Sequence, residues 1–111
     1  MDIVFKTKRL EKQCNSIQTG TRAWGADGAR RVRRRLDDLR AAENLEVMRR
    51  LPGRCHELRG EWAGVLSLDL RHPYRLLFEP ADEPVPVKAD GGLDWASVTT
   101  VRILGIEDTH E

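Results

Sequence analysis

Two histidines and two arginines in the second half of the chain are the side chains best suited to chemistry. His56 and Arg59 stand in the segment His-Glu-Leu-Arg-Gly, Arg75 lies in the segment Tyr-Arg-Leu-Leu-Phe, and His110 stands near the end. Histidine transfers protons near neutral pH, and arginine binds phosphate through two donors. These types suit metal-independent RNA cleavage, in which a 2′-hydroxyl attacks the adjacent phosphate. Their types and spacing alone do not establish such a site, because scattered surface groups look the same.

The elements that must hold these residues are short strands. After Gly53 the apolar pattern has a period of two, which predicts strands over 55–58, 66–70, 74–78 and 98–106. An antiparallel meander would bring the four chemistry-bearing residues onto neighbouring strands and their ends. Arg75 shares a strand face with Leu77, so it must either line a cleft or pair with an acid such as Glu57 or Asp69.

The first half of the chain predicts helices. After a short strand over 3–5, one apolar stripe runs through Leu10, Cys14 and Ile17, and Gly20 is the expected stop. A second helix, capped by Asp27, would bury a stripe made of Ala29, Val32, Leu36 and Leu39. A third, short helix would begin at Asn44 and end at 52–53.

Together these elements predict one α+β domain over residues 1–111. Two or three N-terminal helices would pack on one face of a three- to four-stranded antiparallel sheet, because helices and sheet each have a single apolar side. The other face of the sheet would be available for a ligand. Residues 80–94, rich in proline, glycine and acids, are expected to form a loop without chemistry of its own.

Composition excludes several classes of protein. Of the 111 residues, 40% are apolar and 33% are charged, which is typical of a globular domain. No apolar run is long enough to cross a bilayer and the start lacks the core of a signal peptide, so we expect a cytoplasmic protein. Cys14 and Cys55 have no ligand-spaced partners, and we expect free thiols and no metal site.

Charge is divided unevenly along the chain. Residues 1–60 hold 15 basic and eight acidic residues, a net charge of +7, whereas residues 61–111 have a net charge of −6. This division favours a polyanionic partner on one face. The arginine-rich helix predicts an RNA-facing surface made of Arg30, Arg31, Arg34 and Arg35. The alternative is a helix whose arginines are merely solvated.

Six segments resemble, in order, the HigB-like toxins of the RelE/ParE superfamily, which belong to type II toxin–antitoxin pairs. The most specific is Leu-Pro-Gly-Arg-Cys-His-Glu-Leu-Arg-Gly-Glu-Trp at 51–62, followed by Ser-Leu-Asp-Leu at 67–70 and Tyr-Arg-Leu-Leu-Phe-Glu-Pro at 74–80. The others are the start at 1–12, the stretch 35–45 and the ending Val-Arg-Ile-Leu-Gly-Ile-Glu-Asp-Thr-His at 101–110. The resemblance thus covers nearly the whole chain.

The resemblance implies a ribosome-dependent endoribonuclease that cleaves translated mRNA without a cofactor. It implies that His56 transfers a proton, Arg59 binds phosphate and Arg75 stabilises the transition state. Asp108 and His110 match the family's C-terminal motif, with Asp108 orienting a histidine and His110 as the second proton carrier. Thr109 stands where the family has an aromatic residue, which weakens any stacking on an mRNA base. The implied partners are the ribosome, mRNA and a HigA-like helix-turn-helix antitoxin, with no membrane.

Two other functions remain open at this point. A ParE-like protein would share the fold but inhibit DNA gyrase without cutting any nucleic acid. His56, Arg75 and His110 argue against it, because such an inhibitor needs no acid–base groups. A binding-only module, inactive because of Thr109, is the other alternative, and residual cleavage would distinguish it.

Overall fold

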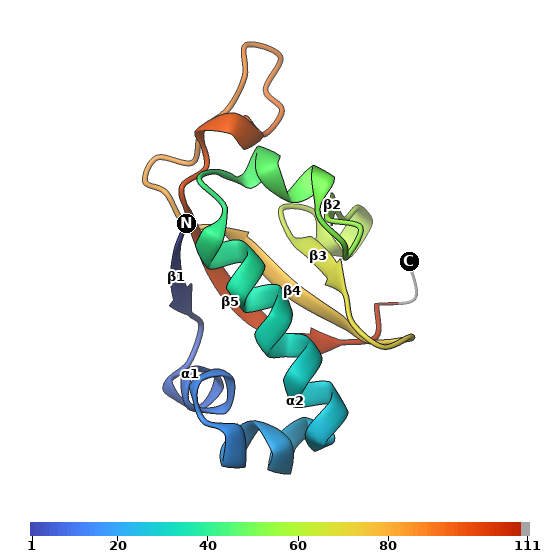
Figure 1. The fold of residues 1–111 in the computed structure, drawn as a ribbon. Helices are drawn as coiled ribbons and strands as arrows, with labels where there is room; N and C mark the ends of the chain where they lie inside the picture. Colours follow the sequence, from blue (N-terminus) through green and yellow to red (C-terminus); the bar gives the residue numbers. More distant parts are fainter. Residues whose placement is uncertain (110–111) are drawn as a thin grey trace.

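The computed structural model describes residues 1–109, in which a mixed five-stranded sheet is covered on one face by helices (Figure 1). The strand order is β1-β5-β4-β3-β2. The bounds are β1 Asp2–Phe5, β2 His56–Glu57, β3 Leu66–Asp69, β4 Arg75–Pro80 and β5 Thr100–Glu107. The helices are α1 Lys8–Asn15 and α2 Ile17–Ala41, with short 3-10 helices at Leu45–Arg50, Gly60–Trp62 and Trp95–Ser97.

The predicted α+β class and the antiparallel meander of β2, β3, β4 and β5 are confirmed. The sheet is one strand wider than expected, because β1 pairs in parallel with β5 from Asp2 opposite Thr100 to Phe5 opposite Ile103. Parallel neighbours need a long crossover, and here the rest of the chain, helices included, lies between the two strands.

The two long helices differ from the prediction at their junction. Ser16 ends α1 and caps α2, since its Oγ accepts a hydrogen bond from Thr19 N at 3.2 Å. Ile17 therefore starts α2 and is 63% exposed, rather than extending the stripe of Leu10 and Cys14. The expected stop at Gly20 is wrong, because Gly20 lies buried inside α2.

A break at Gly25, with φ 75° and ψ 166°, divides α2 into two helical parts. Only glycine adopts this backbone conformation readily. The part after the break buries Val32, Leu36 and Leu39 as predicted, whereas Ala29 is only half-buried. This part of α2 lies across the sheet in Figure 1. The predicted third helix is the 3-10 helix Leu45–Arg50, but Asn44 makes no side-chain cap to it.

The core fills the space between α2 and the sheet. The face of the sheet toward the helices carries Leu66, Leu68, Leu76 and Phe78, each at most 1% exposed. The segment 81–94 projects from the body as a long loop, as predicted, and a bridge between Val87 and Leu93 closes its tip (Figure 1). Among residues 1–109, no helix is long and apolar enough to cross a membrane.

Candidate functional site

The face of the sheet opposite the helices carries the predicted chemistry. Ser67 and Asp69 alternate with the core leucines of β3, so their side chains point to this face. On β2, His56 lies directly opposite Ser67 of β3. On β4, Arg75 lies directly opposite Asp69 of β3. Directly opposite side chains share a face. The sheet therefore brings His56 and Arg75 together although 19 positions of sequence separate them.

Arg75 contacts Asp69 and Thr109. Its Nε lies 3.7 Å from Asp69 Oδ1, and its Nη1 donates to Thr109 Oγ1 at 3.0 Å. The Arg75 side chain is 15% exposed, and a guanidinium at that depth requires an acid beside it. The expectation that Arg75 pairs with an acid is met by Asp69.

Asp69 also binds Arg54, a site residue that the sequence analysis did not single out. Arg54 Nε and Nη2 donate to the Asp69 carboxylate at 3.0 and 3.3 Å. A hollow of about 80 Å³ lies beside these side chains and is lined also by Tyr74 and His72. The presence of Gly53 before Arg54 was the available signal, because it indicates a turn that re-aims the next side chain.

His56 and Arg59 border a second, wider hollow. They line it together with Arg49, Glu57 and Trp95, and its volume is about 670 Å³. His56 Nδ1 lies 2.8 Å from the carbonyl oxygen of Arg54, and Arg59 is exposed at the end of β2. His56 therefore both contacts the main chain of Arg54 and lines this hollow, the cationic hollow, which Arg49 and Arg59 also border.

The wall of this hollow is built around Trp95. Its Nε1 donates to Glu57 Oε2 at 2.9 Å, and the Arg49 guanidinium lies 3.6 Å from the centre of its ring. Trp95 is 4% exposed, so its indole is a packing element rather than a free surface for stacking. Arg49 is in turn paired with Glu46 at 2.9 Å.

The end of β5 approaches the site from the other side. Glu107 is the last residue of β5 and lies opposite Arg75, and Asp108 and Thr109 follow it. Asp108 is half-buried and has an interaction partner. His110, the predicted second proton carrier, lies outside the described residues.

The arginine-rich surface lies on α2 and differs from residue to residue. Arg30 and Arg31 pair with the half-buried Asp27, at 2.5 and 2.9 Å, and Arg34 is exposed. A hydrogen bond from Arg31, the largest effect, and the charges of Arg31 and Arg30 hold the pKa of Asp27 below its usual value. Arg35 instead points to the sheet, where its Nε donates to the main-chain oxygen of Asp69 at 3.0 Å.

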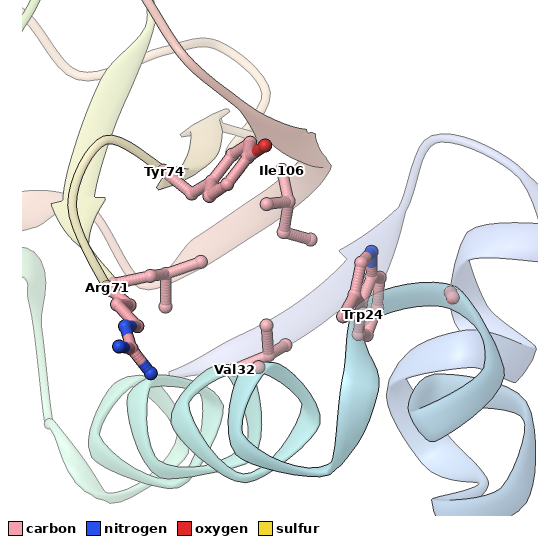
Figure 2. Close-up of a pocket in the computed structure, with 8 residues that line it drawn as sticks. Trp24, Val32, Arg71, Tyr74 and Ile106 are labelled. Carbon is pink, nitrogen blue, oxygen red and sulfur yellow. The ribbon is translucent and has the colours of Figure 1, made fainter.

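An apolar groove lies between α2 and the turn that joins β3 to β4 (Figure 2). Its volume is about 310 Å³. Trp24 and Val32 rise into it from α2, and Tyr74 and Ile106 lie across from them. Arg71 closes one end and reaches Asp27 at 3.6 Å. The groove and the cationic hollow share no lining residue.

The two cysteines are free, as predicted, and both are buried. Burial raises the pKa of the Cys14 thiol to about 11 and that of the Cys55 thiol to about 12, against smaller lowering effects of Arg40 and Arg49. Within residues 1–109, no three His, Cys, Asp or Glu side chains gather closely enough to hold a metal ion.

No family model and no curated protein sequence matches the chain. Among solved structures, the YoeB/ParE toxin from Agrobacterium tumefaciens superposes with a TM-score of 0.60 at 10% identity, over 97% of this chain and 98% of that one. The YoeB-YefM complex from Staphylococcus aureus gives 0.57 at 12% identity, over 96% and 94%. The YoeB dimer from the same organism gives 0.55 at 13%, over 95% and 92%.

At these identities the likeness establishes the fold and not the activity. It confirms the fold that the resemblance implied, while the HigB-like branch remains a prediction. Over nearly its whole length, the chain has the α+β fold seen in these YoeB and YoeB/ParE toxin structures.

Proposed function

We propose that this protein is the toxin of a type II toxin–antitoxin system and a ribosome-dependent endoribonuclease that cuts translated mRNA. The observation that carries the proposal is the placement of His56 and Arg75 on one face of the sheet. Strand spacing and rise put their Cα atoms roughly 12 Å apart. Both side chains point to that face, where each lines a hollow, and the scissile phosphate is proposed to bind between them.

The proposed reaction needs a base, an acid and a group that stabilises the additional negative charge at the phosphate. A base takes the proton of the 2′-hydroxyl, whose oxygen attacks the adjacent phosphorus. The bond from phosphorus to the 5′-oxygen breaks, an acid protonates that oxygen, and a 2′,3′-cyclic phosphate and a 5′-hydroxyl result. The nucleophile is internal, so no metal is required to generate it.

Each of these roles is assigned to a side chain of the site. His56 is one proton carrier, and His110 is the proposed second one, with Asp108 orienting a histidine. Arg75 stabilises the additional negative charge on the phosphorane, because its guanidinium is already fixed before the charge develops. Arg59, exposed beside His56 in the cationic hollow, binds a neighbouring phosphate.

Binding to the ribosome is assigned to the arginine-rich surface of α2. Arg30, Arg31 and Arg34 are exposed and can contact ribosomal RNA phosphates. Arg35, although predicted for the same role, is engaged with the main chain of Asp69 and contributes by fixing α2 to β3. The proposed neutralising partner is a HigA-like helix-turn-helix antitoxin. One solved neighbour is a complex of YoeB with YefM, which supports a protein partner.

The proposal is tested by induced expression in a bacterial host, with primer extension on a translated mRNA. The wild type should halt growth and cut within the reading frame, and Arg75→Ala should cut about 100- to 1,000-fold more slowly. Arg102→Ala is the matched control, because Arg102 lies on β5, is paired with Glu79 at 3.4 Å and lies outside the site. Growth arrest with intact mRNA and DNA damage would instead favour a ParE-like gyrase inhibitor.

A further inference from the structure

Arg54 has a main-chain conformation that L side chains rarely adopt. Its φ of 51° is the one positive value among the non-glycine residues that the structure describes, and Gly53 before it has φ 114°. Two successive left-handed residues turn the chain sharply from the 3-10 helix into β2. Such conformations persist where the surroundings impose them, and they gather at functional sites.

The consequence of this turn is the contact between Arg54 and His56. The carbonyl oxygen of Arg54 lies 2.8 Å from His56 Nδ1. A carbonyl oxygen can only accept, so Nδ1 must carry the hydrogen of this bond. In the neutral ring, Nε2 then has no hydrogen and its lone pair is available. The turn at Arg54 thus selects the tautomer in which Nε2 can take a proton.

Whereas the main chain of Arg54 contacts His56, its side chain supports Arg75 through Asp69. Arg54 holds the Asp69 carboxylate through two donors, at 3.0 and 3.3 Å, and the same carboxylate lies 3.7 Å from Arg75 Nε. One negative charge therefore separates two guanidinium groups that would otherwise repel each other.

Asp69 is itself fixed through its main chain. Its N–H donates to the Gly53 carbonyl oxygen at 2.7 Å, and its own carbonyl oxygen accepts from Arg35 Nε at 3.0 Å. A Cβ on Gly53 would lie 3.0 Å from that same Arg35 Nε. The turn, the end of β3 and helix α2 are thus packed into one rigid support.

We propose that Arg54 and Asp69 form a positioning pair, in which the Arg54 main chain sets the tautomer of His56 and the two side chains set the orientation of Arg75. Arg54 is not assigned a contact with the reacting atoms. The role of the pair rests on the cleavage reaction proposed above. Its two contacts are testable without that reaction.

The first experiment measures ¹⁵N chemical shifts of the imidazole rings at a pH where they are neutral. His56 should carry its hydrogen on Nδ1, both in the wild type and in Arg54→Gly, because glycine keeps the turn. His72, exposed on the β3–β4 turn, is the internal control and should favour hydrogen on Nε2, as free histidine does. A wild-type His56 with its hydrogen on Nε2 would overturn the main-chain half of the proposal.

The second experiment follows the Arg75 Nε–H signal and cleavage in the same variants. Both Arg54→Gly and Asp69→Asn should shift this signal and speed its hydrogen exchange. They should lower kcat about ten- to a hundredfold with little change in KM. Asp69→Glu should restore part of the loss. Arg50→Gln, which removes an exposed charge four residues before Arg54, should change neither quantity.

A wild-type kcat in Arg54→Gly and Asp69→Asn, or an unchanged Arg75 Nε–H signal, would overturn the side-chain half of the proposal. If the wild-type protein cleaves no RNA, the proposed function has failed, and the spectra still decide whether the positioning contacts exist.

Discussion

The guanidinium of Arg75 donates a hydrogen bond to the hydroxyl of Thr109, 34 residues further along the chain, at 3.0 Å. This bond joins β4 to the segment that follows β5 and fixes the outer end of the guanidinium. Asp69 holds the inner end, at Nε. Arg75 is therefore oriented from two sides before any substrate is bound.

Thr109→Val removes the acceptor while keeping the shape of the side chain. We expect it to lower single-turnover cleavage of mRNA on programmed ribosomes about two- to tenfold, which corresponds to one lost hydrogen bond. Thr109→Ser keeps the hydroxyl and should cleave at close to the wild-type rate. Equal rates in the valine and serine variants would show that the Thr109 hydroxyl does not orient Arg75.

The sequence was informative where burial imposes a period. Alternation along 66–70 and 74–78 predicted β3 and β4, and it placed Arg75 on a face where it needed an acid. The same reasoning predicted a strand over 3–5 but not its partner. The pattern of a four-residue edge strand does not indicate which strand it pairs with, and here β1 pairs with β5. Register between distant segments is a tertiary property that no local pattern contains.

Arg54 shows the same limit within the site. Its identity predicts a solvated cation, and its role depends on a φ of 51° and on a carboxylate 15 residues away. The helix stop expected at Gly20 was wrong for a related reason. Glycine commonly ends helices, but here it is required by the close approach of α1 to α2.

Gly20→Ala tests that close approach. A Cβ at this position would lie 2.7 Å from the main-chain oxygen of Gln13, which cannot rotate away. Alanine would otherwise favour a helix by up to about 1 kcal/mol. We expect the clash to prevail and the free energy of unfolding to fall by about 1–3 kcal/mol in urea denaturation.

The matched control for Gly20→Ala is Thr21→Ala, which changes the next, exposed residue of α2. Its free energy of unfolding should stay within about 0.5 kcal/mol of the wild type. A stabilised Gly20→Ala variant would mean that helix propensity outweighs the contact and that α1 and α2 can separate at little cost.

The bond from Trp95 Nε1 to Glu57 Oε2 supports the wall of the hollow beside His56. Glu57→Ala would leave the indole N–H of a 4% exposed side chain without its acceptor. We expect a loss of about 1 kcal/mol in the free energy of unfolding, because Glu57 itself is exposed and water replaces part of the bond.

A double-mutant cycle with Trp95→Phe isolates this bond from the packing of the ring. Once the indole N–H is absent, removing the Glu57 carboxylate should cost less, and the difference gives the coupling energy. Circular dichroism is the appropriate probe, because Trp95 also contributes to the fluorescence. Additive effects of the two substitutions would show that the hydrogen bond contributes nothing to stability.

Because both thiols are buried, we expect the free energy of unfolding to fall at alkaline pH. Burial raises the pKa of the Cys14 thiol from 9.0 to about 11, and that of Cys55 to about 12. Well below pH 9.0 both thiols are neutral in the folded and unfolded states, so the free energy of unfolding does not depend on their titration. As pH rises toward these values, the unfolded chain loses its thiol protons first, and stability should fall.

Cys55→Ala should therefore flatten the loss of stability between pH 9.0 and the folded value of about 12. The same burial should make both native thiols alkylate at least about a hundredfold more slowly than in urea, because only the thiolate reacts. A Thr21→Cys thiol, placed on the exposed face of α2 in a Cys14→Ala, Cys55→Ala background, provides the rate for an accessible cysteine. Native labelling as fast as that reference would show that α1 opens from the core or that Cys55 reaches solvent. The support beneath His56 would then be less rigid than a preoriented Arg54–Asp69 pair requires.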